Sequence, residues 1–509
     1  MKSTANPGPD RRIRLWLFCA ALGALALRLF DLGARPVHTD EAVNAVIVGN
    51  LLGGATYRYD PHDHHGPSFF YLTAGLCRLL GDRSLAGMAA WQLRAGAALA
   101  GAATVPLAAL LAGEAAGGAL LAGLLLALGA PFVCYGRTAI HESLLVFAIL
   151  LALGAGWRFW KCGRFGWAVA AGLGAGLAAC TKEAAPLIAG AALLSLAICR
   201  MHPPTRRLWR EQRSPALSES RLARGALVAA GIALALALLF YSSFGENPAG
   251  LRDALRSVPL LSTRALTGAG QEKPWWTYVS WLGRPSPLCL PWFGWLTAAG
   301  WVGGAAWSFR TGVNAPLARF LSVLGAILFA AYAATPYKTP WLMLEFLGPV
   351  TIVAGIGLAR VLGTLPGRKP AIVVACLVAA LLDRETAKLC FRFAGNPRNP
   401  YAYAPTSPDL GRLTARLDAL AAGSPQGRSL VIEVAGADYW PLPWYLRKFP
   451  RVGYWSRLPE DRVGAVVLVS ADQVARAETV LGPGWHREFF GLRADVLVYL
   501  YTRTPPAHA

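Results

Sequence analysis

The chain has 509 residues, of which 55% are hydrophobic and only 15% are charged. Its apolar residues gather in runs long enough to cross a hydrocarbon layer of about 30 Å, which predicts a membrane protein with several spans. The net charge of +21 would suit nucleic acid, but the basic residues lie mainly in short loops between apolar runs, where they orient membrane proteins, so we expect no nucleic-acid partner.

The N-terminal apolar run follows basic residues, as in a secretory signal. No small-residue cleavage site comes after it, because Arg28, Asp31 and Arg35 follow at once, so we expect a retained first helix. The apolar runs predict about eleven spans. They lie near residues 14–32, 88–112, 116–135, 139–157, 166–181, 183–199, 225–243, 287–308, 317–335, 341–362 and 371–388. The run at 68–80 is too short to span.

Basic loops determine the predicted orientation. With the N-terminus in the cytoplasm, the basic loops at 157–165, 200–224, 310–319 and 360–370 also face the cytoplasm, as is usual for short loops rich in Lys and Arg. We therefore expect a multi-pass protein of the plasma or inner membrane. Its outer loops include a first loop at about 33–87 and a long loop at about 244–286. An odd number of spans places the C-terminus outside.

The chain changes character near Cys390. Residues 396–400 are rich in turn formers, 407–422 have a helical apolar pattern, and 430–434, 465–469 and 496–501 are typical of buried strands. The predicted fold is mainly α, with a polytopic membrane helical bundle in residues 1–389 and a small α/β extramembrane domain in residues 390–509. The other cysteines lie in or beside apolar runs, so no disulfide or zinc spacing is visible.

The motif His38-Thr39-Asp40-Glu41 stands just past the first apolar run. An ionisable pair at that position must either lie in water or take part in chemistry, and the predicted orientation places it at the outer face. Asp40 and Glu41 are therefore candidate catalytic residues. The alternative is that the pair is only the solvated end of a helix.

Four further outer loops bring ionisable residues to the same face. They are the segments 135–142, 181–183, 243–287 and 335–341, and the first loop adds 59–67. Ionisable residues at a membrane edge are costly and are functional candidates by default. Besides the acidic pair, the candidate site residues are His38, Arg137, His141, Glu142, Lys182, Glu183, Tyr337 and Lys338.

Each candidate also has a structural interpretation. Arg137 and Glu142 suit an internal ion pair at the membrane boundary, and Lys182 with Glu183 suits adjacent charges that reach toward water from a span end. Lys338 lies between two prolines in a tight turn, where a lone cation suits an anionic headgroup.

The first outer loop is rich in histidine. His62, Asp63, His64 and His65 carry ordinary metal ligands, so a divalent metal is one candidate cofactor. Their spacing matches no standard zinc site. A solvated loop that binds substrate is the alternative.

These motifs resemble the GT-C glycosyltransferases, the group of protein O-mannosyltransferases and lipid A aminoarabinose transferases. The chain is more closely similar, over essentially its whole length, to a family from archaea and bacteria labelled flippase-associated and linked to N-glycosylation. The shared motifs are His38-Thr39-Asp40-Glu41, His65-Gly66-Pro67, Tyr337-Lys338-Thr339-Pro340-Trp341, Asn399-Pro400-Tyr401 and Tyr439-Trp440-Pro441-Leu442-Pro443-Trp444-Tyr445-Leu446-Arg447. The GT-C resemblance implies that Asp40 is the catalytic base or its partner, with Glu41 beside it. GT-C transferases vary in metal use, and the histidine-rich loop departs from the mannosyltransferase pattern.

The chemistry of such a transfer fits these residues. A polyprenyl-phosphate-linked sugar donor needs a carboxylate to deprotonate or position the acceptor, cations to offset the phosphate leaving group, and a groove for the lipid tail. Asp40 supplies the first, while Lys338, Arg137 and Lys182 are candidates for the second. The apolar spans supply the third. The acceptor is a protein, a lipid or a glycan, and the outer α/β domain carries aromatic residues that suit sugar rings or its own core.

Two alternatives come from other classes of protein. A flippase or transporter of lipid-linked sugar would use acids and cations to line a passage, but polar residues should then lie near the bilayer midplane. Here they cluster at span ends on one face. A noncatalytic component of a glycosylation pathway would bind the same lipid-linked sugar without transferring it.

Overall fold

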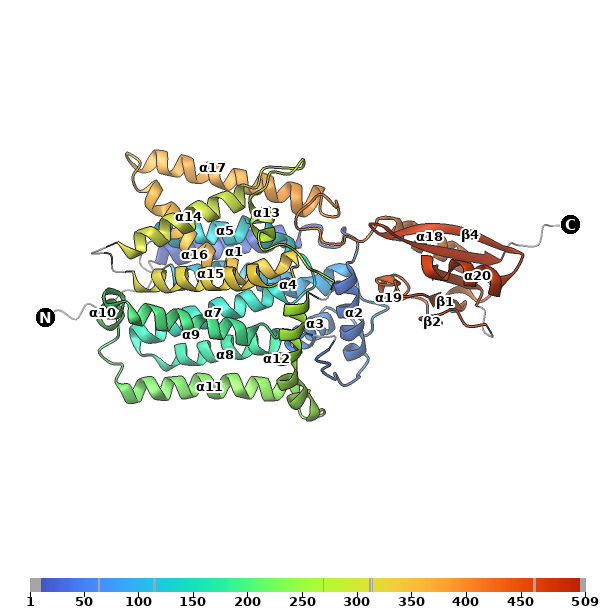
Figure 1. Ribbon diagram of the computed structural model, residues 1–509, viewed down its shortest axis with the longest axis horizontal. Helices are drawn as coiled ribbons and strands as arrows, with labels where there is room; N and C mark the ends of the chain where they lie inside the picture. The colour runs from blue at the N-terminus through green and yellow to red at the C-terminus, as the bar shows by residue number, and fades with distance from the viewer. Residues whose placement is uncertain are drawn as a thin grey trace.

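A computed structural model of the chain describes residues 11–62, 65–112, 116–268, 270–310, 313, 315–460 and 464–503. Figure 1 shows two parts, a large bundle of roughly parallel helices and a small domain built on a sheet, which lies beyond one end of the bundle. The fold class predicted from the sequence is therefore confirmed.

Each predicted span contains a helix. The helices are α1 (Arg11–Leu29), α4 (Ala90–Leu111), α5 (Ala116–Leu128) with α6 (Ala130–Tyr135), α7 (Glu142–Cys162), α8 (Phe165–Thr181), α9 (Ala185–Met201), α11 (Glu219–Tyr241), α14 (Trp292–Phe309), α15 (Pro316–Ala334), α16 (Met343–Leu362) and α17 (Arg368–Thr386). Within the described residues, 5 helices are long and apolar enough to cross a membrane by length and composition alone, or 6 if a bent pair is counted as one. The predicted number of spans therefore stays a prediction.

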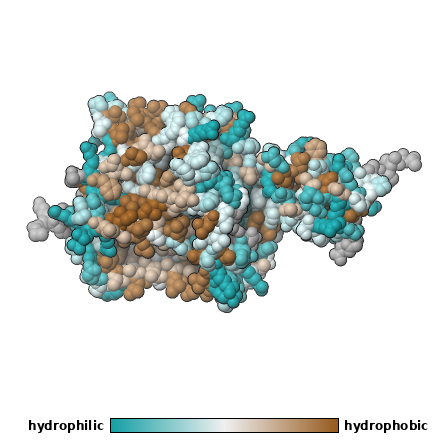
Figure 2. Space-filling model, in the orientation of Figure 1, coloured by the Kyte–Doolittle hydropathy of each residue, from teal (hydrophilic) through white to brown (hydrophobic). Residues whose placement is uncertain are grey.

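The two ends of the bundle differ. One end carries the arginine-rich α10 (Pro203–Glu211), which bends by 101° from α9 and lies across the end of the bundle. The other end carries the short helices α2 (Thr39–Leu52), α3 (Ser68–Leu79), α12 (Ala249–Thr267) and α13 (Thr277–Gly283), which belong to the predicted outer loops. Figure 2 shows hydrophobic surface over the side of the bundle and hydrophilic surface toward both ends. This is the surface pattern of a membrane domain.

Glycines let the helices of the bundle approach closely. A Cβ atom at Gly357 of α16 would lie 2.0 Å from the carbonyl oxygen of Gly300 in α14, so only glycine fits there. At Gly176 of α8, a Cβ atom would lie 2.8 Å from the Cα of Ala233 in α11. Small residues at such crossings allow backbone contact where lipid gives no hydrophobic drive between helices.

The C-terminal domain holds a five-stranded sheet in the order β2-β1-β3-β5-β4. The strands are β1 (Ile432–Ala435), β2 (Val452–Trp455), β3 (Val466–Ser470), β4 (Trp485–Arg493) and β5 (Val496–Arg503). Its helices are α18 (Asp409–Ala422), α19 (Leu442–Tyr445) and α20 (Val474–Leu481). Strand β1 is parallel to β2 and β3, whereas β5 is antiparallel to β3 and β4. The predicted strands correspond to β1, β3 and β5. The edge strands β2 and β4 were missed because neither carries a continuous apolar run.

Short turns of helix complete the fold. They are η1 (Pro340–Leu342), η2 (Ala387–Arg392), η3 (Gly427–Ser429) and η4 (Ala471–Gln473), of which η2 is a π-helix that continues α17. A linker of irregular chain runs from η2 to α18. Hydrogen bonds fasten it to the bundle, because Tyr135 donates its hydroxyl to the Tyr401 carbonyl at 3.1 Å and Thr406 donates to the Val37 carbonyl at 2.9 Å.

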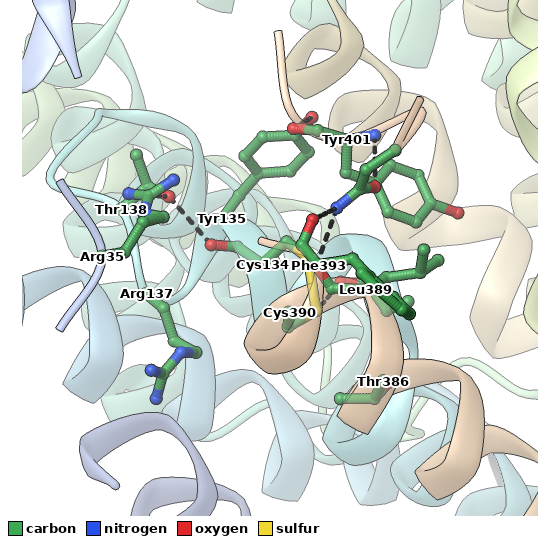
Figure 3. Close-up of a disulfide and its surroundings, with 12 residues drawn as sticks. Arg35, Cys134, Tyr135, Arg137, Thr138, Thr386, Leu389, Cys390, Phe393 and Tyr401 are labelled. Atoms are coloured by element: carbon green, nitrogen blue, oxygen red, sulfur yellow. Dashed lines mark hydrogen bonds between the residues drawn. A yellow bond between two sulfur atoms is a disulfide. The ribbon is translucent and has the colours of Figure 1, made fainter. Parts of the chain in front are cut away.

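A disulfide joins Cys134 of α6 to Cys390 of η2 (Figure 3). The two residues are 256 positions apart in the sequence, and their Cα atoms lie 5.0 Å apart. The spacing of the cysteines in the sequence gave no sign of this bond. Spacing carries no sign of a bond that tertiary packing creates between two distant apolar segments.

We expect Cys134 and Cys390 to be oxidised in protein purified without reductant. Peptide mass spectrometry after blocking of free thiols should find the two cysteines in one linked peptide pair. The exposed Cys19 and Cys376, which are free thiols in the structure, should be labelled in the same sample and serve as controls. Labelling of Cys134 to the same extent as Cys376 would contradict the bond.

Candidate functional site

Asp40 and Glu41 lie in the first turn of α2, and their side chains point to different surroundings. His38 is extended and caps the helix, with its Nδ1 atom accepting from the Asp40 amide at 3.1 Å and its own amide donating to Glu41 at 3.0 Å. This capping box turns Glu41 back toward the helix start. Glu41 is then fully buried, while 45% of the Asp40 side chain is exposed.

Glu41 is the centre of a buried ion cluster. Its Oε1 atom accepts from Arg94 Nε at 2.7 Å and from the Ala139 amide at 2.8 Å. Its Oε2 atom accepts from Arg94 Nη2 at 2.8 Å and from Arg35 Nη2 at 3.0 Å, besides the His38 amide. Burial alone would raise the pKa of Glu41, but Arg94 and Arg35 outweigh it and hold the pKa well below its usual value. Glu41 therefore stays ionised and has its oxygens occupied by the protein.

Asp40 lines a pocket at the same end of the bundle, which we call the Asp40 pocket. Its walls come from the segment before α2, from the residues after α6, from η1 and from the linker. They are Arg35, Pro36, His38, Tyr135, Thr138, Ile140, Trp341, Ala394, Gly395, Tyr401, Ala402, Tyr403, Pro405 and Thr406. The exposed carboxylate thus faces a space with one guanidinium and several aromatic rings around it.

The floor beside the Asp40 pocket contains the disulfide. Figure 3 shows Arg35 and Thr138 on one side of the Cys134–Cys390 bond and Tyr401 on the other. Arg35 donates to Thr138 Oγ1 at 3.0 Å. Asn399 donates to the carbonyls of Leu389 and Phe393 at 2.8 and 3.0 Å, which fixes the start of the linker. The disulfide and these hydrogen bonds hold the linker wall of the pocket in place.

Arg137 forms its hydrogen bonds with the end of helix α1. Its guanidinium donates to the carbonyls of Arg28 and Asp31 at 2.9 and 3.1 Å, and also to those of Leu27 and Phe30, all at the C-terminal end of α1. The carbonyls that end a helix need such donors. The expected ion pair between Arg137 and Glu142 is therefore wrong. A role for Arg137 toward the donor phosphate stays a prediction.

Glu142 pairs with Lys182 instead. Lys182 Nζ lies 2.7 Å from Glu142 Oε1 and 3.0 Å from Glu345 Oε1, and Tyr332 donates its hydroxyl to Glu345. All these side chains are buried. The expectation that Lys182 pairs with its neighbour Glu183 and reaches water is wrong, because the second acid comes from α16. The role of Lys182 toward a donor phosphate stays a prediction.

Glu183 forms a separate polar group with two residues of the first outer loop. It accepts from Tyr59 at 2.8 Å, and its Oε2 lies 2.9 Å from His65 Nδ1. Burial alone would lower the pKa of His65, but Glu183 outweighs it and raises the pKa. His141 is buried against Phe69 and the ring of His65.

Only two of the four predicted metal ligands lie within the described residues. Asp63 and His64 lie outside the described residues, His62 is exposed, and His65 faces Glu183. Among the residues that the structure describes, no group of three or more His, Cys, Asp or Glu side chains could hold a metal ion. A divalent metal in this loop therefore stays a prediction.

Lys338 is buried next to the pocket rather than in its wall. Only 1% of the residue is exposed, its ammonium donates to the Thr335 carbonyl, and it lies 6.0 Å from the centre of the Tyr278 ring. Burial, helped by Lys273, lowers the pKa of Lys338. Tyr337 pairs as an isolated bridge with Glu272, which ties this turn to the long outer loop. A phosphate contact by Lys338 stays a prediction.

Several residues around the site are not among those that the sequence singles out. Arg94 and Glu345 are lone charges inside apolar runs, and that isolation is a usable signal of function or of a buried partner. Arg35 was noted only as a charge after the first run. Tyr401 and Tyr403 enter the pocket from the linker, and no local pattern indicates this placement.

Comparisons with known proteins agree with this architecture. Residues 76–214 match the family described as dolichyl-phosphate-mannose-protein mannosyltransferase. The crystal structure of ArnT from Cupriavidus metallidurans bound to undecaprenyl phosphate superposes with a TM-score of 0.63 at 17% identity, covering 95% of this chain and 98% of that one. Its apo state gives the same TM-score and identity, covering 95% and 97%. The chain has the GT-C fold.

The other comparisons are weaker. The Pmt1-Pmt2 complex of S. cerevisiae bound to the sugar donor has a TM-score of 0.37 at 20% identity, covering 52% of this chain and 36% of that one. This is too low to carry an argument. A search of curated proteins finds no match. With its GT-C fold and its apolar helices, the chain is an integral membrane protein.

The two adjacent acids allow a matched test of the site. Glu41→Gln leaves the buried Arg94 and the partly exposed Arg35 without their anion, so we expect a loss of stability of about 3–5 kcal/mol. Asp40→Asn removes a half-exposed carboxylate whose oxygen lies 3.9 Å from the His38 ring, and should leave stability nearly unchanged. Thermal unfolding of both variants in detergent checks this. Equal melting temperatures would contradict the assignment of Glu41 to a structural cluster.

Proposed function

We propose that this GT-C protein is a membrane glycosyltransferase. In this proposal it moves a sugar from a polyprenyl-phosphate-linked donor to a protein, lipid or glycan acceptor at the outer face of the membrane. The observation that carries the proposal is the Asp40 pocket, where an exposed carboxylate and a guanidinium line one space in a GT-C fold. The family match over residues 76–214 supports it, because that family uses a lipid-phosphate-linked sugar by name.

Asp40 acts as the base that takes the proton from the acceptor hydroxyl, or positions that hydroxyl. Its side chain is open to the pocket, whereas Glu41 is fully occupied, so the pair divides into one reacting acid and one structural acid. A positioned acid or base contributes roughly 10²- to 10⁴-fold to rate.

Arg35 stabilises the phosphate leaving group in this proposal. The cluster behind it contains two guanidiniums, Arg35 and Arg94, against the single carboxylate of Glu41. The net positive charge faces the pocket through Arg35, which suits an anionic phosphate whose charge grows in the transition state. Lys338 lies nearby and forms no ion pair in the described part of the chain. It remains a second cation for this role, ahead of the fully engaged Arg137 and Lys182.

The site faces the outside in this proposal. Disulfides persist in oxidising compartments, and the Cys134–Cys390 bond lies at the site end of the bundle. The arginine-rich α10 lies at the opposite end, as expected for a cytoplasmic face. Nucleotide sugars are not available outside the cell, which favours a lipid-linked donor.

Transfer by purified protein in detergent tests the reaction. With a polyprenyl-phosphate hexose and a mixed acceptor extract, Asp40→Asn should lower the rate roughly 10²- to 10⁴-fold. Asp418→Asn, which changes an acid on α18 far from the pocket lining, serves as the matched control. A flippase makes no glycosidic bond in detergent. Absence of product from the wild type, or full transfer by Asp40→Asn, would count against the proposal.

Reporter fusions test the orientation. A fusion after Arg213, beyond α10, should report the cytoplasm, and a fusion at the C-terminus should report the outside. The physical reason is that the basic loops gather at the α10 end and the disulfide at the other. Cytoplasmic signals from both fusions would contradict the outer-face site.

A further inference from the structure

A second and larger groove lies beside the Asp40 pocket. It has a volume of about 600 Å³ and is open to solvent. Four separate parts of the chain line it: the end of α13 with the loop after it, Pro340, the linker, and Ala494 in the turn between β4 and β5. Figure 2 shows the constriction between the bundle and the C-terminal domain, and Figure 1 shows that the chain joining the two parts crosses there. We call this space the arginine groove.

The arginine groove is built from rigid chain. Its lining contains the prolines Pro285, Pro287, Pro340, Pro397, Pro400 and Pro405. Proline fixes its own backbone angle, so these segments lose little freedom when a ligand binds. Asn399 adds hydrogen bonds to the carbonyls of Leu389 and Phe393. The groove is therefore formed before any ligand arrives.

The charged residues of the groove are all cations. Arg284 and Arg398 line it, and the lining contains no acid. Both side chains are exposed, and neither forms an ion pair within the described residues. A guanidinium presents paired donors that match the oxygens of a carboxylate or a phosphate. The groove is therefore suited to an anion that approaches from water.

Aromatic side chains add surfaces for a sugar ring. Trp281 and Tyr403 line the groove with the two arginines. Tyr403, Ala402 and Pro405 also line the Asp40 pocket, so a thin wall of linker separates the two spaces. His38 holds this wall through a contact of 3.0 Å between its Nε2 atom and the Tyr403 carbonyl. A ligand in the groove can thus extend one end toward Asp40.

We infer that the arginine groove binds the acceptor and that this acceptor is an anionic saccharide, one that carries a carboxylate or a phosphate. The inference rests on the proposed function and names its acceptor class. Asp40 takes the proton from an acceptor hydroxyl, whose oxygen forms the bond to C1 of the donor sugar. The bond between C1 and the phosphate oxygen breaks, and its electron pair leaves with the polyprenyl phosphate.

The position of the groove favours a soluble saccharide over a lipid headgroup. Ala494 belongs to the C-terminal domain, which lies beyond the end of the bundle in Figure 1, and the linker lies between them. The donor phosphate has its own cation in Arg35, inside the Asp40 pocket. Arg284 and Arg398 are therefore left for a second anion.

Binding without turnover tests the inference. Saturation-transfer NMR on the purified protein should detect glucuronic acid and glucose 6-phosphate, with glucose binding roughly tenfold more weakly because it lacks the charge-assisted hydrogen bonds. Arg284→Ala with Arg398→Ala should remove this preference, and Arg284→Lys with Arg398→Lys should keep part of it. Arg252→Ala, an exposed arginine on α12 outside the groove, is the control.

The outcomes separate this inference from the proposed function. Asp40→Asn should bind the charged sugars normally while transfer is lost. Equal binding of glucose and glucuronic acid would overturn the inference and leave the transfer reaction intact. Inorganic phosphate gives no saturation-transfer signal and is added as a competitor, and displacement of half of the bound glucose 6-phosphate by an equal concentration of it would overturn the saccharide assignment. Anionic phospholipid in nanodiscs that is retained by the wild type and lost from the double alanine variant would assign the groove to a headgroup instead.

Discussion

The buried carboxylate of Glu41 is the interaction on which the site end of the molecule depends. The two carboxylate oxygens of Glu41 accept hydrogen bonds from Arg94 in α4, from Arg35 and His38 before α2, and from the Ala139 amide after α6. An isolated charge at that depth would be strongly unfavourable, and only this complete set of partners offsets its loss of water. Because Glu41 is fixed, its neighbour Asp40 is held facing the pocket.

Charges elsewhere in the bundle also act mainly on the protein itself. Arg28 donates to the carbonyls of Leu126 and Ala127 at the end of α5, while Arg137 does the same at the end of α1. A helix that ends in an apolar surrounding leaves carbonyls without donors, and a long guanidinium reaches several of them at once. Two arginines thus bind neighbouring helix ends to each other. Such use of cations makes it hard to distinguish a ligand-binding arginine from a structural one by position in the sequence.

The sequence was sufficient for the helices and for the gathering at one end of the bundle of the loops that it predicts to be outer, because hydrophobic length and the distribution of basic residues follow from the bilayer itself. It singled out the pair Asp40 and Glu41, but it could not tell which of the two faces open space and which is buried. It failed where a partner comes from a distant helix: Glu345 with Lys182, Arg94 with Glu41, and Cys134 with Cys390. These pairings depend on how helices pack, and no local pattern encodes that. The linker residue Tyr403 was missed for the same reason.

The Cys134–Cys390 bond also constrains the order in which the protein can be assembled. Cys134 is made early and Cys390 follows α17, so every helix from α7 to α17 lies within the closed loop. The bond cannot form until α17 has been synthesised and its end has reached the compartment that holds Cys134. The linker that walls the Asp40 pocket begins at that bond. A nascent chain therefore carries Asp40 for most of its synthesis without an enclosed pocket, and a competent site arises only once insertion is complete.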